Sequence, residues 1–499
     1  MEFLNPVLPG CYPDPTVCRV GRDYYLATSS FEYFPGVPLF HSRNLVDWEP
    51  IGYALTRDEQ LSVRDASASE GIFAPTLRHR DGTFYLVTTN VGGDGHFVVT
   101  ADDPRGEWSD PTWIDAPGFD PDLFWDGDDA YLTYAHDSVV EQTTVDVETG
   151  ETDERRTLWT GTEGDFTEAP HLYAVDGSYY LVLAEGGTHT GHMVVVARAD
   201  APTGPFRENP ENPVLSHRAE IHHPIQATGH ADFVRAHDGT WWAICLGVRQ
   251  HGDHPGYHHL GRETFLAPVR WEDGWPVVNG DDPLGRLVRR SDTALEATGG
   301  RSWTATRDAF ADDGLGVEWN YRRNPHRDRY AVQDGTLVLR GGPETLDEKR
   351  PTFVGRRQQQ FDCQAETRLD FDPSGDEEAG FTVGIDEEHH FDLAVTERTG
   401  DRIALTRLRI GDATETIATT TLGAGPVTLA VEADRHEYRF AAVADGRRRS
   451  MGSARSKYLS TEVAGGFTGV FIGLYATGNG SPAETPARFR SFRYRPAGE

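Results

Sequence analysis

The sequence predicts an all-β protein, a five-bladed β-propeller followed by a C-terminal β-sandwich. The first observation is an internal repeat of five segments, each a tight turn followed by aromatic or apolar residues in a β-rich run: GRDYYLATSS (21–30), DGTFYLVTTN (81–90), GDDAYLTYAH (127–136), DGSYYLVLAE (176–185) and DGTWWAICLG (238–247). The second is a further series of alternating segments from Phe310 onward that lacks this repeat. No helical periodicity is long enough to compete.

The five repeats keep one register. Each follows a shorter apolar stretch at a constant offset of ten residues, in the pairs Asp14 and Tyr24, Ala74 and Phe84, Asp120 and Ala130, Ala169 and Tyr179, and Ala231 and Trp241. Each pair predicts two antiparallel strands joined by a tight turn. Five units of roughly 45–60 residues, each with about four strands, are typical of a propeller. An open sandwich would also supply many strands, but not the constant register.

The repeat weakens after about residue 285, which sets the expected domain boundaries. We expect a propeller over residues 1–290 and a polar linker with a Gly-Gly pair over 291–308. Residues 309–499 then form the sandwich, because their alternating segments are numerous and share no repeat.

The charge is strongly acidic and evenly spread. A net charge of -32 excludes a general nucleic-acid binder, which needs a basic face. Lys349 and Lys457 are the only lysines. Dispersed acid with little lysine suits a protein working in concentrated salt, which screens self-repulsion, so we expect a halophilic source. An ordinary acidic protein is the alternative, but it leaves the scarcity of lysine unexplained.

Localisation follows from three further features. The start MEFLNPVLPG has no basic or apolar run of a secretory signal, and no stretch is long enough to span a membrane. The four cysteines show no metal-ligand spacing and suit free thiols in a reducing compartment. We therefore expect a cytoplasmic protein without membrane or nucleic-acid partners.

The predicted site lies where the first strands of the five units begin. Because equivalent positions of propeller blades surround one axis, these starts converge on one mouth of the channel: Pro13-Asp14, Phe73-Ala74, Phe119-Asp120, Glu168-Ala169 and His230-Ala231. Asp14 also lies between two prolines, which stiffen the segment that presents it. Asp-Pro is by itself a common turn signal, but the repeat brings three carboxylates together, and burying unpaired carboxylates is costly.

Carboxylates facing each other across a small cavity suit cleavage of glycosidic bonds. One protonates the leaving oxygen, and the other acts as base or nucleophile. A third carboxylate nearby raises the pKa of the acid by like-charge repulsion and orients it. Arg262 would donate to sugar hydroxyls, and Phe31 and Phe73 would form an apolar wall for a sugar ring.

Motifs in both predicted domains resemble glycoside hydrolase family 43, and in particular its two-domain β-xylosidases, which also act on α-L-arabinofuranosides. These motifs are NPVLPGCYPDPT, SSFEYFPGVPLFHSRNLVDW, GIFAPTLRHRDGTFYLVTTN, GFDPDLFWDGDDAYLTY, TEAPHLYAVDGSYYLVLAEGGTHTGHM, HPIQATGHADFV, HHLGRETFLAPVRWEDGWPVV, FVGRRQQ and FTGVFIGLYA. The resemblance implies hydrolysis with inversion, with Asp14 as general base, Glu168 as general acid and Asp120 as the carboxylate that tunes and orients the acid. Here Glu168 is followed by Ala169, where Glu-Gly-Pro-His is common in the family.

The resemblance also implies the binding residues. Arg262, Phe31, Phe73 and Thr188 match sugar-contacting positions, although Phe73 stands where some relatives have Trp. Phe467 matches a sandwich residue that closes the pocket. His230 matches a histidine on the channel axis that orients the site through water or binds calcium, so a Ca²⁺ ion on the axis is an expectation, with no cofactor required for the chemistry.

These inferences predict an exo-acting β-1,4-xylosidase that releases xylose from the non-reducing ends of xylo-oligosaccharides. Two alternatives remain, an α-L-arabinofuranosidase and a carbohydrate-binding propeller without catalysis. The sequence leaves open whether the protein forms a homo-oligomer. The histidine-rich loop over residues 249–264 (His251, Asp253, His254, His258 and His259) has irregular spacing, which favours a solvated loop at the pocket rim over a metal site.

Overall fold

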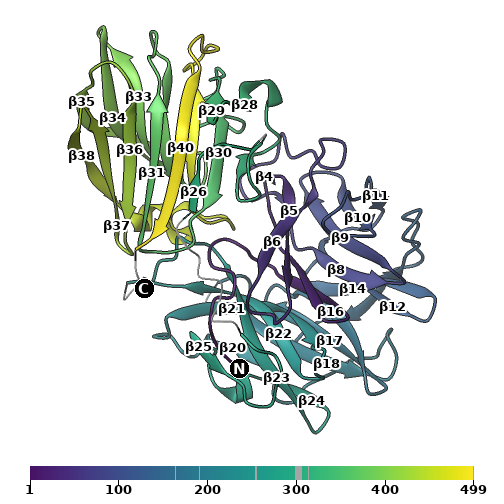
Figure 1. The fold of residues 1–499 in the computed structure, drawn as a ribbon. Coiled ribbons are helices and arrows are strands. Elements are labelled where there is room, and N and C mark those ends of the chain that lie inside the picture. The colour runs from purple at the N-terminus through teal and green to yellow at the C-terminus, as the bar shows by residue number, and fades with distance from the viewer. Residues whose placement is uncertain (163, 190, 253–254, 298–305, 313, 498–499) are drawn as a thin grey trace.

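The computed structural model describes residues 1–497 apart from 163, 190, 253–254, 298–305 and 313. It has two all-β domains, a propeller in purple to teal and a sandwich in green to yellow (Figure 1). None of the helices in the described chain is long and apolar enough to cross a membrane. The short helices are η1 (Asn279–Asp281), η2 (Arg327–Arg329), η3 (Ser456–Leu459) and α1 (Thr461–Ala464).

The propeller has five blades of four or five antiparallel strands, which confirms the predicted fold class. The first blade is β2 (Thr16–Val20), β3 (Asp23–Ala27), β5 (Gly36–Ser42) and β6 (Glu49–Leu55). The second is β7 (Gly71–Ile72), β8 (Thr76–Arg80), β9 (Thr83–Val91), β10 (Gly95–Ala101) and β11 (Thr112–Ile114). The third is β12 (Phe119–Asp126), β13 (Asp129–His136), β14 (Val139–Thr144) and β15 (Arg156–Trp159).

The fourth blade is β16 (Glu168–Val175), β17 (Ser178–Glu185), β18 (Met193–Ala199), β19 (Arg207–Glu208) and β20 (Leu215–Ser216). The fifth is β21 (Ile225–Arg235), β22 (Trp241–Arg249), β23 (Glu263–Glu272) and β24 (Trp275–Val278). All five predicted hairpins are present as antiparallel pairs. In the turns at Asp81-Gly82 and Asp176-Gly177 both residues have positive φ, which a type I′ turn requires.

A polar cluster on the axis joins the blades beneath the predicted site. The Arg78 guanidinium, from the second blade, donates to Asp122 of the third at 2.6 Å and to Asp232 of the fifth at 3.1 Å. Asp232 also accepts from the Thr16 hydroxyl of the first blade at 2.7 Å, and Arg78 lies 3.2 Å from His171 Nδ1 of the fourth. Each blade therefore contributes one side chain to a buried ion-paired network, which satisfies the charges it encloses.

The N-terminus and the segment after the fifth blade pair with each other. Strand β1 (Glu2–Leu4) is antiparallel to β25 (Leu287–Arg289). The next residues lie on the fifth blade, where the Asn5 side chain donates to the Leu266 carbonyl at 3.0 Å and the Val7 N–H donates to Thr264 at 2.9 Å. These bonds hold the segment leading to Asp14 against the last blade.

The sandwich consists of two eight-stranded sheets around one apolar core. One sheet contains β28 (Tyr330–Gln333), β29 (Thr336–Leu339), β40 (Ala487–Pro496), β31 (Cys363–Asp370), β36 (Val427–Ala433), β37 (Glu437–Ala444) and β38 (Arg447–Arg455), with β26 (Thr306–Asp308) on β40. The other contains β35 (Ala413–Thr421), β34 (Asp401–Ile410), β33 (His389–Arg398), β32 (Glu378–Gly384), β39 (Phe471–Thr477), β30 (Thr352–Arg357), β27 (Asn320–Arg322) and β4 (Tyr33–Phe34). Strand β26 lies within the stretch expected to be a linker.

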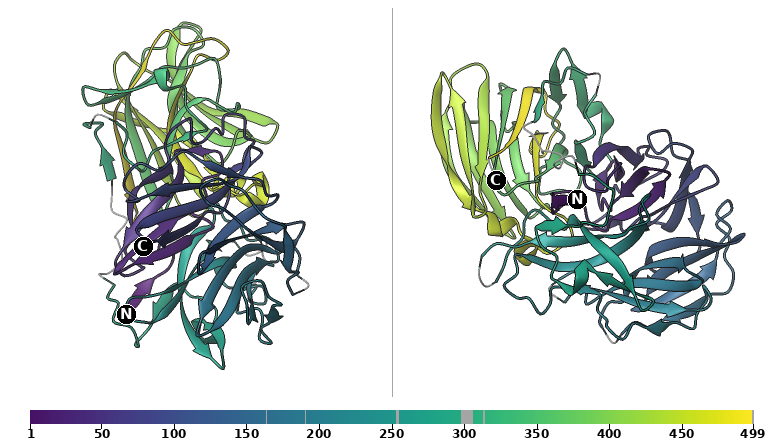
Figure 2. Two further views of the ribbon diagram at one scale, coloured as in Figure 1. Left: turned by 90° about the vertical axis from the view of Figure 1, so that its right-hand side faces the viewer. Right: turned by 60° about the horizontal axis from the view of Figure 1, so that its bottom comes forward.

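The two domains share a sheet. Strand β4 belongs to the first propeller unit in sequence, yet it pairs with β27 at the edge of the sandwich. The Tyr33 ring stacks on Phe471 of β39, with the centroids 3.9 Å apart. The sandwich lies along one side of the propeller in both further views (Figure 2). This pairing fixes the sandwich beside the loop that carries Phe31.

Candidate active site

The predicted strand starts are distorted in a way that the register alone does not show. Asp14, Asp120, Ala169 and His230 all have φ between 49° and 54°. The pairing of β12, β16 and β21 with their neighbours shifts register at these starts. Bulges of this kind redirect side chains, often beside functional sites. Asp14 and Asp120 occupy the left-handed position itself, whereas Glu168 immediately precedes it.

Asp14 is 4% exposed and held from several sides. Its carboxylate accepts a hydrogen bond from Arg262 Nη1 at 2.8 Å and from the Ser29 hydroxyl at 2.5 Å, and His230 Nδ1 lies 3.4 Å away. A carboxylate has about four lone-pair sites, so these contacts fix its orientation and leave it able to accept from a water molecule.

Glu168 and Asp120 lie in a different environment, because no arginine or lysine in the described part of the chain forms an ion pair with either carboxyl. Burial, followed by the charge of Asp14, raises the pKa of Glu168 to about 7. Burial and the neighbouring Glu168 charge raise the pKa of Asp120 well above its ordinary value, against a hydrogen bond from the Ala74 N–H. Like charges enclosed in one site disfavour the ionisation of all of them at once. The site therefore contains one carboxyl paired with Arg262 and two carboxyls whose pKa values are raised.

His230 lies beside Asp14 as predicted, and burial lowers its pKa to about 3, so the ring is neutral. The surrounding groups do not fit a Ca²⁺ ion, which takes six to eight oxygen ligands. The nearby carboxylates Asp122 and Asp232 are already paired with Arg78. Within the described ranges, no group of three or more His, Cys, Asp or Glu side chains could hold a metal ion.

An aromatic wall lies beside the carboxylates. The Phe31 ring lies 5.5 Å from Phe73 and 6.0 Å from Phe467, and Phe73 lies 6.1 Å from Phe119. The Arg262 guanidinium lies 5.5 Å from the ring centres of both Phe31 and Phe467. A planar cation that contacts two aromatic rings and is paired with a carboxylate is held rigidly.

The remaining predicted binding residue, Thr188, completes this group. Its hydroxyl accepts a hydrogen bond from Arg262 Nη1 at 3.2 Å. The structure thus brings together all nine side chains that the sequence predicted for the site: Asp14, Phe31, Phe73, Asp120, Glu168, Thr188, His230, Arg262 and Phe467.

The sandwich reaches the site through the segment that carries Phe467. The Phe467 N–H donates to the Ser69 hydroxyl at 2.8 Å, and its carbonyl lies 3.5 Å from Arg262 Nη2. The Val470 N–H donates to the His259 carbonyl at 2.9 Å, three residues before Arg262. Phe467 is 39% exposed. The segment is therefore fastened to the propeller on both sides of an aromatic ring that remains open to a ligand.

The histidine-rich loop differs from the prediction. Asp253 and His254 lie outside the described residues. His251 and His259 are 7% and 0% exposed, and their rings pack with Phe361 of the sandwich. The expectation of a solvated rim was wrong for these two, because the second domain covers the loop.

Two contributors to the site escaped the sequence analysis. Ser29 lies just after β3 and bonds Asp14, and Ser69 lies in a loop and anchors Phe467. Serines in loops are common, and no spacing or repeat distinguishes these two.

A five-bladed propeller with three carboxylates at one mouth, an arginine and an aromatic wall defines a glycosidase. Residues 3–276 match glycosyl hydrolases family 43, and residues 307–495 match the β-xylosidase C-terminal concanavalin A-like domain. The chain belongs to glycosyl hydrolase family 43.

Similar proteins span the whole chain. A non-reducing end α-L-arabinofuranosidase of Bacteroides ovatus is 42% identical over 99% of this chain and 94% of its own length. A β-xylosidase of Bacillus subtilis is 32% identical over 99% of this chain and 100% of its own. Among solved structures, a family 43 protein of the Bacteroides ovatus xyloglucan locus has a TM-score of 0.95 at 40% identity, and each chain is covered completely. A xylan β-1,4-xylosidase of Bacillus halodurans has a TM-score of 0.89 at 30% identity, covering 99% of this chain and 100% of its own.

Proposed function

We propose that this protein is an inverting exo-glycosidase that releases xylose from the non-reducing ends of xylo-oligosaccharides. One observation supports this most directly. The Asp14 carboxyl is bonded by Arg262 and Ser29, while burial and neighbouring acidic charges raise the pKa of both Glu168 and Asp120 in the same site. Two carboxyl environments that differ in this way separate a base from an acid.

The proposed reaction needs no group beyond these side chains and water. Glu168 donates its proton to the glycosidic oxygen as the bond to the anomeric carbon breaks. Asp14 takes a proton from a water molecule, which attacks the opposite face of the sugar and inverts its configuration. Asp120 orients Glu168, whose pKa is kept high by burial and by the charge of Asp14. An inverting pair stands roughly 6.5–9.5 Å apart, which leaves room for the water.

Exo action is supported by the closure of the site. Phe467 and Phe31 cover it from the sandwich and the propeller, and Arg262 lies close to both rings. Such a site accommodates a terminal sugar more readily than the middle of a chain. The test is a product analysis on xylobiose and longer xylo-oligosaccharides. Release of xylose alone from every length supports exo action, whereas early appearance of larger fragments would contradict it.

A second candidate is mainly α-L-arabinofuranosidase activity. It is favoured by the 42% identity to a relative named for that activity. Several other relatives are named as xylosidases or as xylosidase/arabinosidases, which favours the first candidate. Relative kcat/KM values on the aryl β-D-xyloside and the aryl α-L-arabinofuranoside distinguish the two. NMR of the first sugar released tests inversion, because a retained configuration excludes it.

A binding propeller without catalysis makes a different prediction. Asp14→Asn would then bind sugar as the wild type does, and neither protein would hydrolyse a glycoside. Under our proposal the wild type is active and Asp14→Asn loses activity by at least about a hundredfold, the contribution typical of a general base. Circular dichroism checks that the variant remains folded.

We also propose that the protein works in the cytoplasm and in concentrated salt. All four cysteines are free and buried, which suits a reducing compartment. The high density of acidic groups supports salt dependence through self-repulsion. A homo-oligomer remains part of this proposal and is tested by the mass in solution.

A further inference from the structure

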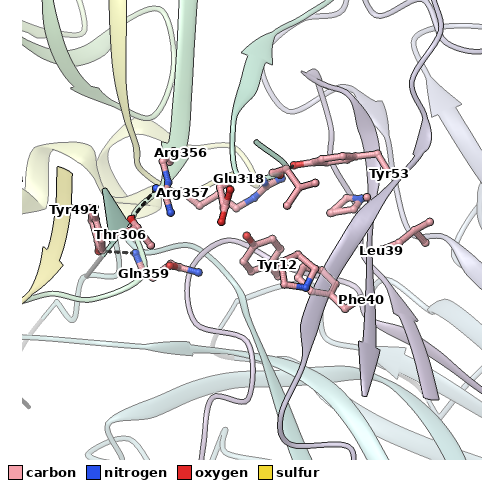
Figure 3. A pocket seen from close by; sticks show the side chains of 14 residues that line it. Tyr12, Leu39, Phe40, Tyr53, Thr306, Glu318, Arg356, Arg357, Gln359 and Tyr494 are labelled. Carbon is pink, nitrogen blue, oxygen red and sulfur yellow. Dashed lines mark hydrogen bonds between the residues drawn. The ribbon is translucent and has the colours of Figure 1, made fainter. Parts of the chain in front are cut away.

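A separate cavity lies between the two domains, away from the carboxylates. The first blade and the N-terminal segment contribute one wall, and the sandwich contributes the other (Figure 3). Its volume is about 50 Å³ for the centres of water molecules, several times the roughly 10–15 Å³ that one water needs. That space suits a ligand of monosaccharide size and excludes a chain of sugars.

Two deeply buried polar side chains face this cavity without a full set of partners. Arg356 is 8% exposed, and within the described chain its guanidinium donates only to the Thr306 hydroxyl, at 2.8 Å. Gln359 is also 8% exposed, and its side-chain amide has no hydrogen-bond partner among the described residues. The unpartnered polar atoms of both side chains keep some exposed surface, and both side chains line the cavity. These groups therefore open into it.

The neighbouring Arg357 differs from Arg356 in its hydrogen-bond partners. Arg357 also lines the cavity, but it donates to the Cys11 carbonyl at 2.7 Å and to Asn320 Oδ1 at 2.6 Å. Its guanidinium lies 4.7 Å from the centre of the Tyr12 ring. Arg357 therefore binds the domains together, while Arg356 retains donors for another molecule.

The other walls define the chemistry of that molecule. Glu318, partly exposed and without an ion pair in the described chain, supplies acceptor oxygens at the rim. Leu39 and the edge-on pair of Tyr12 and Phe40, with ring centres 5.1 Å apart, supply an apolar surface. Donors, acceptors and an apolar face together suit a hydroxylated ring, and the Glu318 carboxylate offsets the charge of one of the two arginines that line the cavity.

We propose that this interdomain cavity is a second binding site for a neutral monosaccharide, a pentose of the kind released at the catalytic site. The choice of a pentose rests on the proposed function, whereas the site itself does not. The ligand would touch Tyr12, whose N–H donates to the Arg262 carbonyl at 3.1 Å and which lies two residues before Asp14. Occupancy would therefore stabilise the domain interface beside the catalytic base.

The test is crystallographic and uses the full chain. Crystals of the wild type are soaked in D-xylose, L-arabinose or D-glucuronate. We expect pentose density in the cavity and no glucuronate there. Pentose density confined to the catalytic pocket overturns the proposal, and glucuronate in the cavity overturns its neutral chemistry.

Variants supply the solution test. Gln359→Leu removes an unpartnered amide. Val317 is 41% exposed at the rim of the cavity, and Val317→Trp fills the cavity from there. Gln333→Leu, on an exposed position of β28, is the matched control. Xylose should raise the thermal midpoint less in the first two than in the wild type and the control, because a ligand stabilises the folded state by RT ln(1 + [L]/Kd), which becomes smaller when Kd rises. Equal rises in all four overturn the proposal.

Hydrolysis keeps the two proposals separate. Gln359→Leu should retain the kcat of the wild type on an aryl glycoside. If the wild type hydrolyses no glycoside, the proposed function fails while the binding result stands. If the wild type is active but the cavity stays empty, the second binding site fails while the proposed function stands.

Discussion

Glu32 is a buried acid whose neutralisation should stabilise the protein. It lies between Phe31 of the aromatic wall and the strand that joins the sandwich, and it is 1% exposed. Its Oε2 accepts a hydrogen bond from the Ser69 N–H at 3.0 Å. Burial raises the pKa of Glu32 to about 7, with a further rise from Glu387 and an opposing effect of Arg323.

The size and pH range of the effect follow from this shift. Below about pH 4.5 the carboxyl is protonated in the folded and unfolded chains, and its burial then causes no loss of stability. As the pH rises, the unfolded chain ionises first, so stability is lost progressively until about pH 7. A shift from 4.5 to about 7, at about 1.4 kcal/mol per pKa unit, corresponds to roughly 3 kcal/mol lost above pH 7.

Glu32→Gln removes this loss while keeping the local hydrogen bond. The amide oxygen can still accept from the Ser69 N–H. We expect the variant to be about 3 kcal/mol more stable than the wild type at pH 8 and to differ little at pH 4.5. The assay is thermal unfolding at both pH values, where the gain should appear as several degrees in the midpoint.

A matched control isolates burial as the cause. Glu49→Gln changes the same group at an exposed position of β6 and should alter stability by less than about 0.5 kcal/mol at either pH. A Glu32→Gln variant that is no more stable at pH 8, or whose gain is the same at pH 4.5, refutes the reasoning.

Four further predictions concern the site and the charge. The kcat/KM profile should fall as pH rises through about 7, because Glu168, whose pKa is raised to about 7, loses the proton of the general acid there; a profile that is flat to pH 9 contradicts this. Phe467→Ala should raise KM about tenfold, since a ring stacked 6.0 Å from Phe31 is lost, and an unchanged KM would show that the ring does not contact the sugar. Ala169→Gly should raise the unfolding free energy by up to about 1 kcal/mol, because Ala169 has φ 54°, and denaturant unfolding measures this. Activity and the thermal midpoint should both increase between low and molar KCl, and full activity without salt excludes the halophilic proposal.

The sequence was sufficient to predict the fold class and the site's principal side chains. The offset of ten residues repeats in all five blades because each blade is the same hairpin, so local turn chemistry and strand alternation were enough. Equivalent strand starts must surround one axis, so the repeat alone predicted that Asp14, Asp120 and Glu168 lie together.

Only the tertiary structure determined the backbone conformation and the contacts of those side chains. The left-handed backbone at Asp14 and Asp120, the hydrogen bond from Ser29 and the anchoring of Phe467 by Ser69 join residues that no local pattern links. The burial of His259 and the cavity beside Arg356 exist because the second domain packs against the first. A repeat can be recognised from spacings within short stretches of sequence. Pairing between distant segments depends on how whole domains pack together, and only the folded chain specifies this packing.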